Sequence, residues 1–237
     1  SNSRKIMTQF WVIIPAAGVG KRMASTQPKQ YLMLNGKTIL DTTIEKFLEH
    51  PQITGIAVGV SPDDEYWQQS EWAGNPQVVR FDGGQERSET VLNGLQVLMA
   101  IGVSDDESVL VHDAARPLVT EAALTRIMTH TGDQGALLAI PCKDTLKLAE
   151  EQRSTATVDR SVIWQAQTPQ KFPLMALYQG LVSALEEGIA ITDESSAMEL
   201  IGWQPDLVEG ESSNLKITVP EDLVIAQALL SIQQTAK

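Results

Sequence analysis

Cysteine is nearly absent from the chain, which has one cysteine, Cys142, among its 237 residues. An internal disulfide is therefore excluded, and we expect a reducing compartment, the cytoplasm. Long hydrophobic runs are missing too, because none approaches the roughly 18 residues that a membrane-spanning helix needs. We therefore expect no membrane partner. The three histidines, His50, His112 and His130, are scattered, which argues against a Cys/His zinc site.

Basic residues are in the minority, with 18 Lys and Arg against 30 Asp and Glu and a net charge of −12. This balance argues against a nucleic-acid partner, because nucleic-acid binders normally present a basic surface. It does not exclude a small anionic ligand, since a local cluster of Lys and Arg sets the field in its own pocket. Residues 1–6 lack a signal core, and we interpret them as an expression remnant or a disordered start. We expect one domain over residues 7–237.

Short apolar runs alternate with amphipathic stretches along most of the chain. The apolar runs predict strands over Phe10–Pro15, Ile53–Val60, Gln77–Phe81, Ser108–His112 and Gly135–Pro141. Helical spacing predicts helices over Thr38–Glu49, Ser88–Ile101, Thr120–His130, Leu174–Glu187, Asp193–Ile201 and Pro220–Ile232. We expect Thr38 and Thr120 to be N-caps. The alternation predicts an α/β fold with a Rossmann-like, mostly parallel sheet and helices on both faces.

One polar stretch, Lys143–Val162, has no clean helical face. We interpret it as two short strands with a turn near Glu150–Ser154. Such a protruding β-arm is either an exposed hairpin or a segment that packs on another subunit.

Three polar clusters follow predicted strands at the edge where parallel sheets bind ligands. The first runs from Pro15 to Met23 (PAAGVGKRM) and continues with Pro28-Lys29-Gln30. A Walker A loop needs glycine where Pro15 stands, and a dinucleotide fingerprint needs Gly or Ala where Met23 stands, so both are excluded. Two interpretations stay open. Either the small residues and nearby cations hold phosphate, or the segment is a plain turn with solvated charges.

The second cluster is Asp82–Ser88 (DGGQERS), whose glycine pair exposes backbone groups that could contact a base edge. The alternative is a tight turn before a helix capped by Ser88. In the third cluster, Asp113 ends an apolar strand, where it could hold Mg²⁺ on substrate phosphates, and Arg116 could bind a phosphate. The alternative there is an Asp113–Arg116 ion pair.

The ordered set of motifs is more specific than any one of them. PAAGxGxRM, PKQY, DGGxxRxxTV, VHDAARP, DT, VDR, TPQ, TDE and NLKIT follow one another along the chain. Between about Val12 and Ala228 the sequence resembles the 2-C-methyl-D-erythritol 4-phosphate cytidylyltransferases of the non-mevalonate isoprenoid pathway. The resemblance implies transfer of CMP from CTP to methylerythritol phosphate, with Mg²⁺ as cofactor and release of pyrophosphate. It also implies a cytoplasmic homodimer in which the arm at about 143–162 joins the subunits.

The resemblance assigns a role to each site residue. The expected catalytic residues are Arg22, Lys29 and Lys216. The expected metal ligand is Asp113. Nucleotide binding falls to Ala16, Ala17, Gly18, Gly84, Gln85 and Thr90. Binding of the acceptor falls to Arg116, Thr145, Arg160 and Thr192, with Thr145 and Arg160 supplied by the partner chain.

Two other functions stay open from the sequence. A cytidylyltransferase for another polyol phosphate, such as ribitol 5-phosphate, would share the nucleotide half and differ around Thr145, Arg160 and Thr192. A non-catalytic nucleotide-binding regulatory protein is the alternative of another class. Lys29, Asp113 and Lys216 argue against it, because a mere binder needs no cation aimed at the reacting phosphate.

Overall fold

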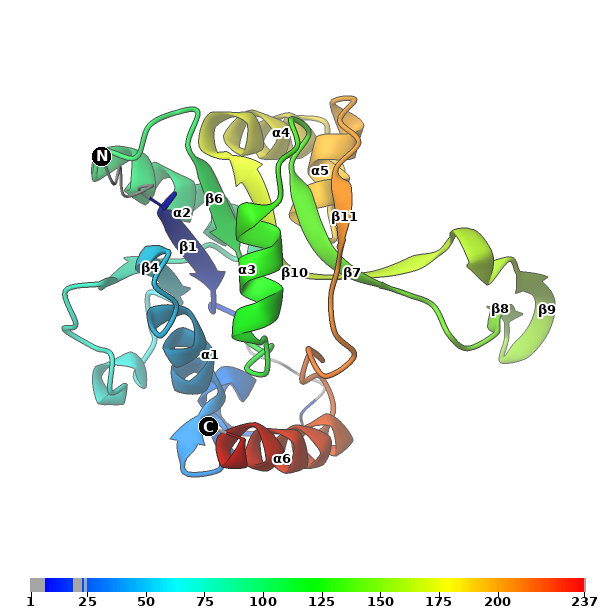
Figure 1. Ribbon diagram of the computed structural model, residues 1–237, viewed down its shortest axis with the longest axis horizontal. Helices are drawn as coiled ribbons and strands as arrows, with labels where there is room; N and C mark the ends of the chain where they lie inside the picture. Colours follow the sequence, from blue (N-terminus) through cyan, green and yellow to red (C-terminus); the bar gives the residue numbers. More distant parts are fainter. Residues whose placement is uncertain (1–6, 19–22, 24, 237) are drawn as a thin grey trace, which may run out of the picture.

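A seven-stranded sheet runs through the computed structural model, which describes residues 7–18, 23 and 25–236 (Figure 1). In spatial order its strands are β11 (Asp206–Glu209), β7 (Ala136–Pro141), β10 (Trp164–Pro173), β6 (Ser108–Val111), β1 (Phe10–Pro15), β4 (Ile53–Val60) and β5 (Val78–Asp82). Neighbouring strands pair in parallel, except that β10 is antiparallel to both β6 and β7. The mostly parallel sheet predicted from the sequence is confirmed.

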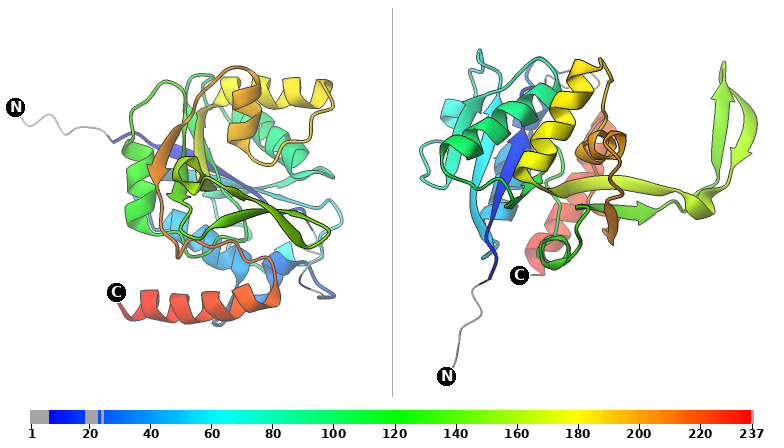
Figure 2. Two further views of the ribbon diagram at one scale, coloured as in Figure 1. Left: turned by 90° about the vertical axis from the view of Figure 1, so that its right-hand side faces the viewer. Right: turned by 90° about the horizontal axis from the view of Figure 1, so that it is seen from above.

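Helices cover both faces of this sheet (Figures 1 and 2). They are α1 (Ile39–Leu48), α2 (Arg87–Ala100), α3 (Glu121–Thr129), α4 (Leu174–Glu186) and α5 (Glu194–Leu200). A sixth helix, α6 (Pro220–Thr235), packs in a separate apolar cluster with Leu34, Ile39 and Leu118. The core on one face packs against α1 and α3, and the core on the other against α2, α4 and α5. Within the described ranges, no helix is both long enough and apolar enough to span a membrane.

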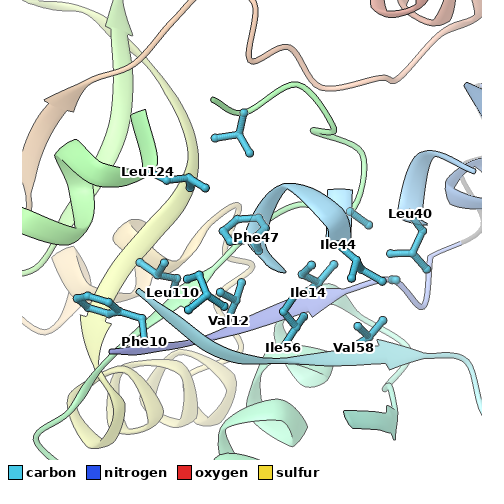
Figure 3. Packing of buried hydrophobic residues seen from close by; sticks show 14 of the residues in the cluster. Phe10, Val12, Ile14, Leu40, Ile44, Phe47, Ile56, Val58, Leu110 and Leu124 are labelled. Carbon is cyan, nitrogen blue, oxygen red and sulfur yellow. The ribbon is translucent and has the colours of Figure 1, made fainter. Parts of the chain in front are cut away.

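Strand β1 is buried on both of its faces, which explains why its sequence is apolar throughout. Val12 and Ile14 point to the face covered by α1 and α3, whereas Ile13 points to the opposite face. All three side chains are fully buried. Figure 3 shows Val12 and Ile14 beside Ile44 and Phe47 of α1. A strand buried on both faces reads as a continuous apolar run rather than an alternating one.

The predicted helix starts are correct at two positions and wrong at a third. The hydroxyl oxygen of Thr38 accepts from the Asp41 amide at 3.0 Å, and that of Thr120 accepts from the Ala123 amide at 3.2 Å. Ser88 does not cap α2, which begins one residue earlier, at Arg87. Strand β11 and a small hairpin of β2 (Met33–Leu34) and β3 (Lys37–Thr38) were not predicted, nor was the full length of β10.

The polar arm is a separate two-stranded hairpin that projects from the body (Figure 1). Its strands are β8 (Leu146–Glu150) and β9 (Arg153–Val158), paired antiparallel. Glu151 and Gln152 join them with φ angles of 48° and 63°, as a two-residue hairpin turn requires. The predicted pair of strands and the position of its turn are therefore correct.

The order of the strands reverses beside β1. From β1 the chain adds β4 and β5 on one side and then crosses to β6 on the other. Ligands of open α/β sheets bind at the carboxyl ends of strands that flank such a reversal. The three polar clusters follow β1, β5 and β6, so the topology brings them to one edge.

Candidate active site

A cavity of about 210 Å³ lies at this edge of the sheet. Residues from all three clusters line it, together with a segment that precedes α6. Of the residues assigned from the sequence, it is lined by Ala16, Ala17, Gly18, Lys29, Gly84, Gln85, Thr90, Asp113 and Lys216. The fold thus gathers the expected nucleotide-binding residues, two of the three expected catalytic cations and the expected metal ligand. Arg22, the third cation, lies outside the described residues.

The first wall of the cavity is the backbone that follows β1. The Ala16 amide donates to the Gly59 carbonyl at 2.7 Å, which continues the sheet hydrogen bonding past the strand. The buried side-chain amide of Gln30 donates to the Ala16 carbonyl at 2.7 Å. Gln30 belongs to a 3₁₀ turn over Lys29–Tyr31, so the same turn that holds this wall also presents Lys29 to the cavity.

The second wall is the glycine pair after β5. A Cβ atom on Gly83 would lie 2.7 Å from the Ala17 Cβ and 2.9 Å from the Thr90 hydroxyl oxygen, so a residue without a side chain is needed there. The buried Thr90 hydroxyl accepts from the Gly84 amide at 3.0 Å and donates to the Glu86 carbonyl at 3.3 Å. Thr90 therefore shapes this loop, in addition to lining the cavity.

Asp113 forms the floor, at the end of β6. Its Oδ1 accepts from Nη2 of Arg87 and its Oδ2 from Nε of Arg116, both at 3.1 Å, and the Lys216 ammonium lies 3.9 Å from Oδ2. Burial alone would raise the pKa of this carboxyl. The charges of Arg87, Lys216 and Arg116 outweigh burial and hold the pKa of Asp113 well below its usual range. The Asp113–Arg116 ion pair considered from the sequence is present, and the same carboxylate lines the cavity.

A hydrogen-bonded chain of buried groups fixes the backbone at Asp113. The Asp113 amide donates to the Thr168 hydroxyl at 3.0 Å, which lies 3.0 Å from Nδ1 of His112. Nε2 of His112 lies 2.9 Å from the Arg116 carbonyl, and a carbonyl only accepts. Nε2 must therefore carry the proton, and Thr168 donates to Nδ1. Burial lowers the pKa of His112 to about 4, against a smaller opposing effect of the Arg116 carbonyl, so the ring is neutral.

Asn214 joins this floor to the segment that carries Lys216. Its side-chain amide donates to the Thr168 carbonyl at 2.9 Å, and its backbone carbonyl accepts from Arg116 Nη1 at 2.7 Å. Asn214, Thr168 and Arg87 were given no role from the sequence, although they lie in the NLKIT, TPQ and DGGxxRxxTV motifs. The motifs marked the right segments, but sequence alone does not show which of their side chains are partners.

The remaining acceptor-site residues lie outside the cavity lining. Arg116 sits behind Asp113 and is mostly buried. Thr192 is exposed just before α5. Thr145 and Arg160 are exposed on the arm, which extends away from the body of the same chain (Figure 2). Arg160 donates to the Lys143 carbonyl across the base of the arm.

Comparisons with known proteins identify the family of the chain. The sequence profile of 2-C-methyl-D-erythritol 4-phosphate cytidylyltransferase matches residues 10–232. A protein of that name from Pseudomonas aeruginosa is 50% identical over 221 residues, which cover 92% of this chain and 94% of that protein.

Two solved structures have the same fold. A 4-diphosphocytidyl-2C-methyl-D-erythritol synthase superposes with a TM-score of 0.82 at 39% identity, over 94% of this chain and 99% of that one. The 2-C-methyl-D-erythritol 4-phosphate cytidylyltransferase of Francisella tularensis has a TM-score of 0.81 at 35% identity, over 94% and 100%. By profile, by identity along nearly its full length and by fold, this chain belongs to the 2-C-methyl-D-erythritol 4-phosphate cytidylyltransferase family.

Proposed function

We propose that the chain transfers CMP from CTP to 2-C-methyl-D-erythritol 4-phosphate in isoprenoid biosynthesis. The products are 4-diphosphocytidyl-2-C-methyl-D-erythritol and pyrophosphate. The observation that carries the proposal is the cavity itself, which combines two close-packed small-residue loops with Lys29, Lys216 and Asp113. Family membership supplies the substrates.

The chemistry suits a site rich in cations. The acceptor phosphate attacks the α-phosphorus of CTP, a new P–O bond forms, and the bond to the β-phosphate oxygen breaks as pyrophosphate leaves in line. The nucleophile is already an anion, so no general base is needed. The barrier lies in bringing two anions together and in the charge that gathers on the α-phosphate, and positioned cations lower both contributions.

We assign the residues as follows. Backbone groups of Ala16, Ala17 and Gly18 hold the nucleotide phosphates, and Gly84 and Gln85 contact the cytosine, with Thr90 shaping their loop. Lys29 and Lys216 stabilise the reacting phosphate, together with Arg22. Arg116 and Thr192 contact the acceptor from the same chain, and Thr145 and Arg160 contact it from the partner chain.

Asp113 suits a magnesium ion that enters with the nucleotide. Mg²⁺ is usually held by one or two carboxylates and completed by substrate phosphates and water, rather than by a cage of protein ligands. Among the described residues, no three His, Cys, Asp or Glu side chains gather as a metal site. Two acidic residues line the cavity, Glu86 and Asp113, and Asp113 is the buried one, so we assign the ion to it. The ion, when bound, neutralises charge on the triphosphate and on the leaving pyrophosphate.

The arm is proposed to join two copies of the chain in a cytoplasmic homodimer. Leu148, Val162 and Trp164 are 56%, 79% and 40% exposed on the arm and at its base. Exposed apolar side chains on a projecting hairpin favour burial against another surface. In such a dimer, Thr145 and Arg160 of one copy would reach the cavity of the other copy.

The test is release of pyrophosphate from CTP and Mg²⁺ with either methylerythritol phosphate or ribitol 5-phosphate as the acceptor. We expect release that requires both CTP and methylerythritol phosphate. Release only when ribitol phosphate is the acceptor would support the same mechanism with a different acceptor substrate. Binding of CTP without release from either acceptor would favour the regulatory alternative.

A further inference from the structure

Glu194 is a carboxylate that the proposed reaction does not use, yet it lies beside the site. It is the first residue of α5 and is only 1% exposed. Burying a charged group is costly unless it is paired, so its partner is informative. That partner is Arg87, whose Nη1 lies 2.5 Å from Oε1 and whose Nη2 lies 3.3 Å from Oε2 of Glu194.

Arg87 is shared between two carboxylates. Its Nη2 also donates to Oδ1 of Asp113 at 3.1 Å, and its Nε lies 3.3 Å from the same oxygen. One planar guanidinium thus connects α5 to the carboxylate that lines the cavity. The Glu194 side chain lies behind Arg87, because Arg87 lines the cavity and Glu194 does not.

The start of α5 is held firmly in place. The buried side chain of Gln170, on β10, accepts from the Ser195 amide at 2.8 Å and donates to the Asp193 carboxylate at 2.9 Å. Asp193 also caps the helix by accepting from the Ser196 amide at 2.8 Å. Glu194 lies between residues fixed on both sides, so its carboxylate offers Arg87 a rigid anchor.

This arrangement affects what Asp113 can bind. Arg87 and Arg116 each donate to one of the two Asp113 oxygens, so a divalent cation can bind Asp113 only by displacing one guanidinium. If Glu194 lost its charge, Asp113 would be the remaining carboxylate in contact with Arg87 among the described residues, and the pair would tighten. The site would also gain one positive charge, which disfavours a metal ion and favours a bare triphosphate.

We propose that Glu194 is a positioning residue that holds Arg87 in a second ion pair and so leaves Asp113 able to exchange a guanidinium for a divalent cation. The inference rests on the proposed function, in which Asp113 receives a metal together with CTP. It predicts the direction of two changes. Neutralising Glu194 should weaken metal binding and should not weaken the binding of CTP without metal.

The experiment compares the full-length chain with its Glu194→Gln variant, which keeps the size of the side chain. Mn²⁺ binding in the presence of CTP is measured from the free Mn²⁺ signal in electron paramagnetic resonance. CTP binding in EDTA is measured by calorimetry. We expect the Kd for Mn²⁺ to rise about tenfold, which is typical of coupled neighbouring sites. The Kd for CTP in EDTA should stay the same or fall.

A second substitution separates this mechanism from loss of structure. Adding Arg87→Met to Glu194→Gln removes the competing cation, so Mn²⁺ affinity should return to within about threefold of the parent chain. If Glu194 only stabilised the fold, the second substitution would instead add to the loss. Glu199→Gln, on the exposed side of the same helix, is the matched control and should bind both ligands normally.

Three results would overturn the inference. The first is Mn²⁺ affinity in Glu194→Gln within twofold of the parent chain. The second is a parallel loss of Mn²⁺ and metal-free CTP binding, and the third is a further loss when Arg87→Met is added. Each leaves the proposed function intact if the parent chain binds Mn²⁺ with CTP. A parent chain that binds no CTP would overturn both.

Discussion

The carboxylate of Asp113 accepts from two guanidinium groups and lies near the ammonium of Lys216. Arg87 is held from behind by Glu194. The groups at this end of the cavity therefore carry three positive and two negative charges. One net positive charge in a mostly buried setting is suited to binding phosphate and disfavours an acid–base role for Asp113, whose pKa is held low.

At the scale of single residues, the first prediction concerns the two lysines of the cavity. Lys29→Ala and Lys216→Ala should each lower kcat by about 10²–10³, while CTP affinity falls much less, because each cation acts on charge that develops in the transition state. Steady-state kinetics and CTP calorimetry measure the two quantities. Lys37→Ala is the control, since Lys37 pairs with Glu45 and Glu71 away from the cavity. Equal losses of rate and affinity would contradict the role.

A second prediction at this scale concerns the buried Thr168 hydroxyl. Thr168→Val leaves the Asp113 amide and Nδ1 of His112 without their partner, which should cost about 2–3 kcal/mol of unfolding free energy. The rate should fall as well, because the backbone of Asp113 is no longer fixed. Thr168→Ser keeps the hydroxyl and should recover most of both. Urea unfolding and kinetics test this, and a valine variant with normal stability and rate would refute it.

At the scale of elements, the arm makes the sharpest prediction. Thr145 and Arg160 lie on a hairpin that projects from the body, and neither lines the cavity of its own chain, so we expect them to serve the partner's site. Arg160→Ala should mainly raise the KM for the alcohol phosphate. Mixing Arg160→Ala subunits with Lys29→Ala subunits should recover activity, because some mixed dimers contain one intact site. No recovery at any mixing ratio would indicate sites built within one chain.

At the scale of the whole molecule, stability should depend on the buried His50. Its Nδ1 accepts from the Gln52 amide at 3.1 Å, and Nε2 lies 2.8 Å from the Thr125 hydroxyl. Burial lowers the pKa of His50 below its ordinary 6.5, against a smaller opposing effect of Glu121. The unfolded chain then takes up a proton before the folded one. The contribution of neutral His50 to stability is therefore complete above about pH 6.5, and it is lost as the pH falls toward the pKa of His50 in the folded chain.

Urea unfolding at pH 7 and pH 5 measures this effect. The free energy of unfolding should be lower at pH 5, and the difference should shrink in His50→Asn, whose side-chain oxygen can replace Nδ1 as an acceptor. An unchanged difference in the variant would assign the pH dependence to other groups.

Most of the sheet could be predicted because its parallel strands are buried on both faces and therefore read as apolar runs. Strand β10 could not, because its sequence, WQAQTPQKFP, is rich in glutamine and proline. Its polar groups become compatible with burial only through partners elsewhere in the chain. Gln170 bonds to Asp193, the Thr168 carbonyl to Asn214, and the Lys171 ammonium to the His130 carbonyl at 2.7 Å.

The sequence by itself determined the α/β class, the hairpin arm and the segments that carry the site, since each depends on local periodicity or on motifs within a few residues of one another. Tertiary structure alone decided that Arg87 shares two carboxylates and that Asp113 lies among three cations. These contacts join residues up to 107 positions apart. Their energy depends on distance and burial in the folded chain, and no local pattern of residues encodes either.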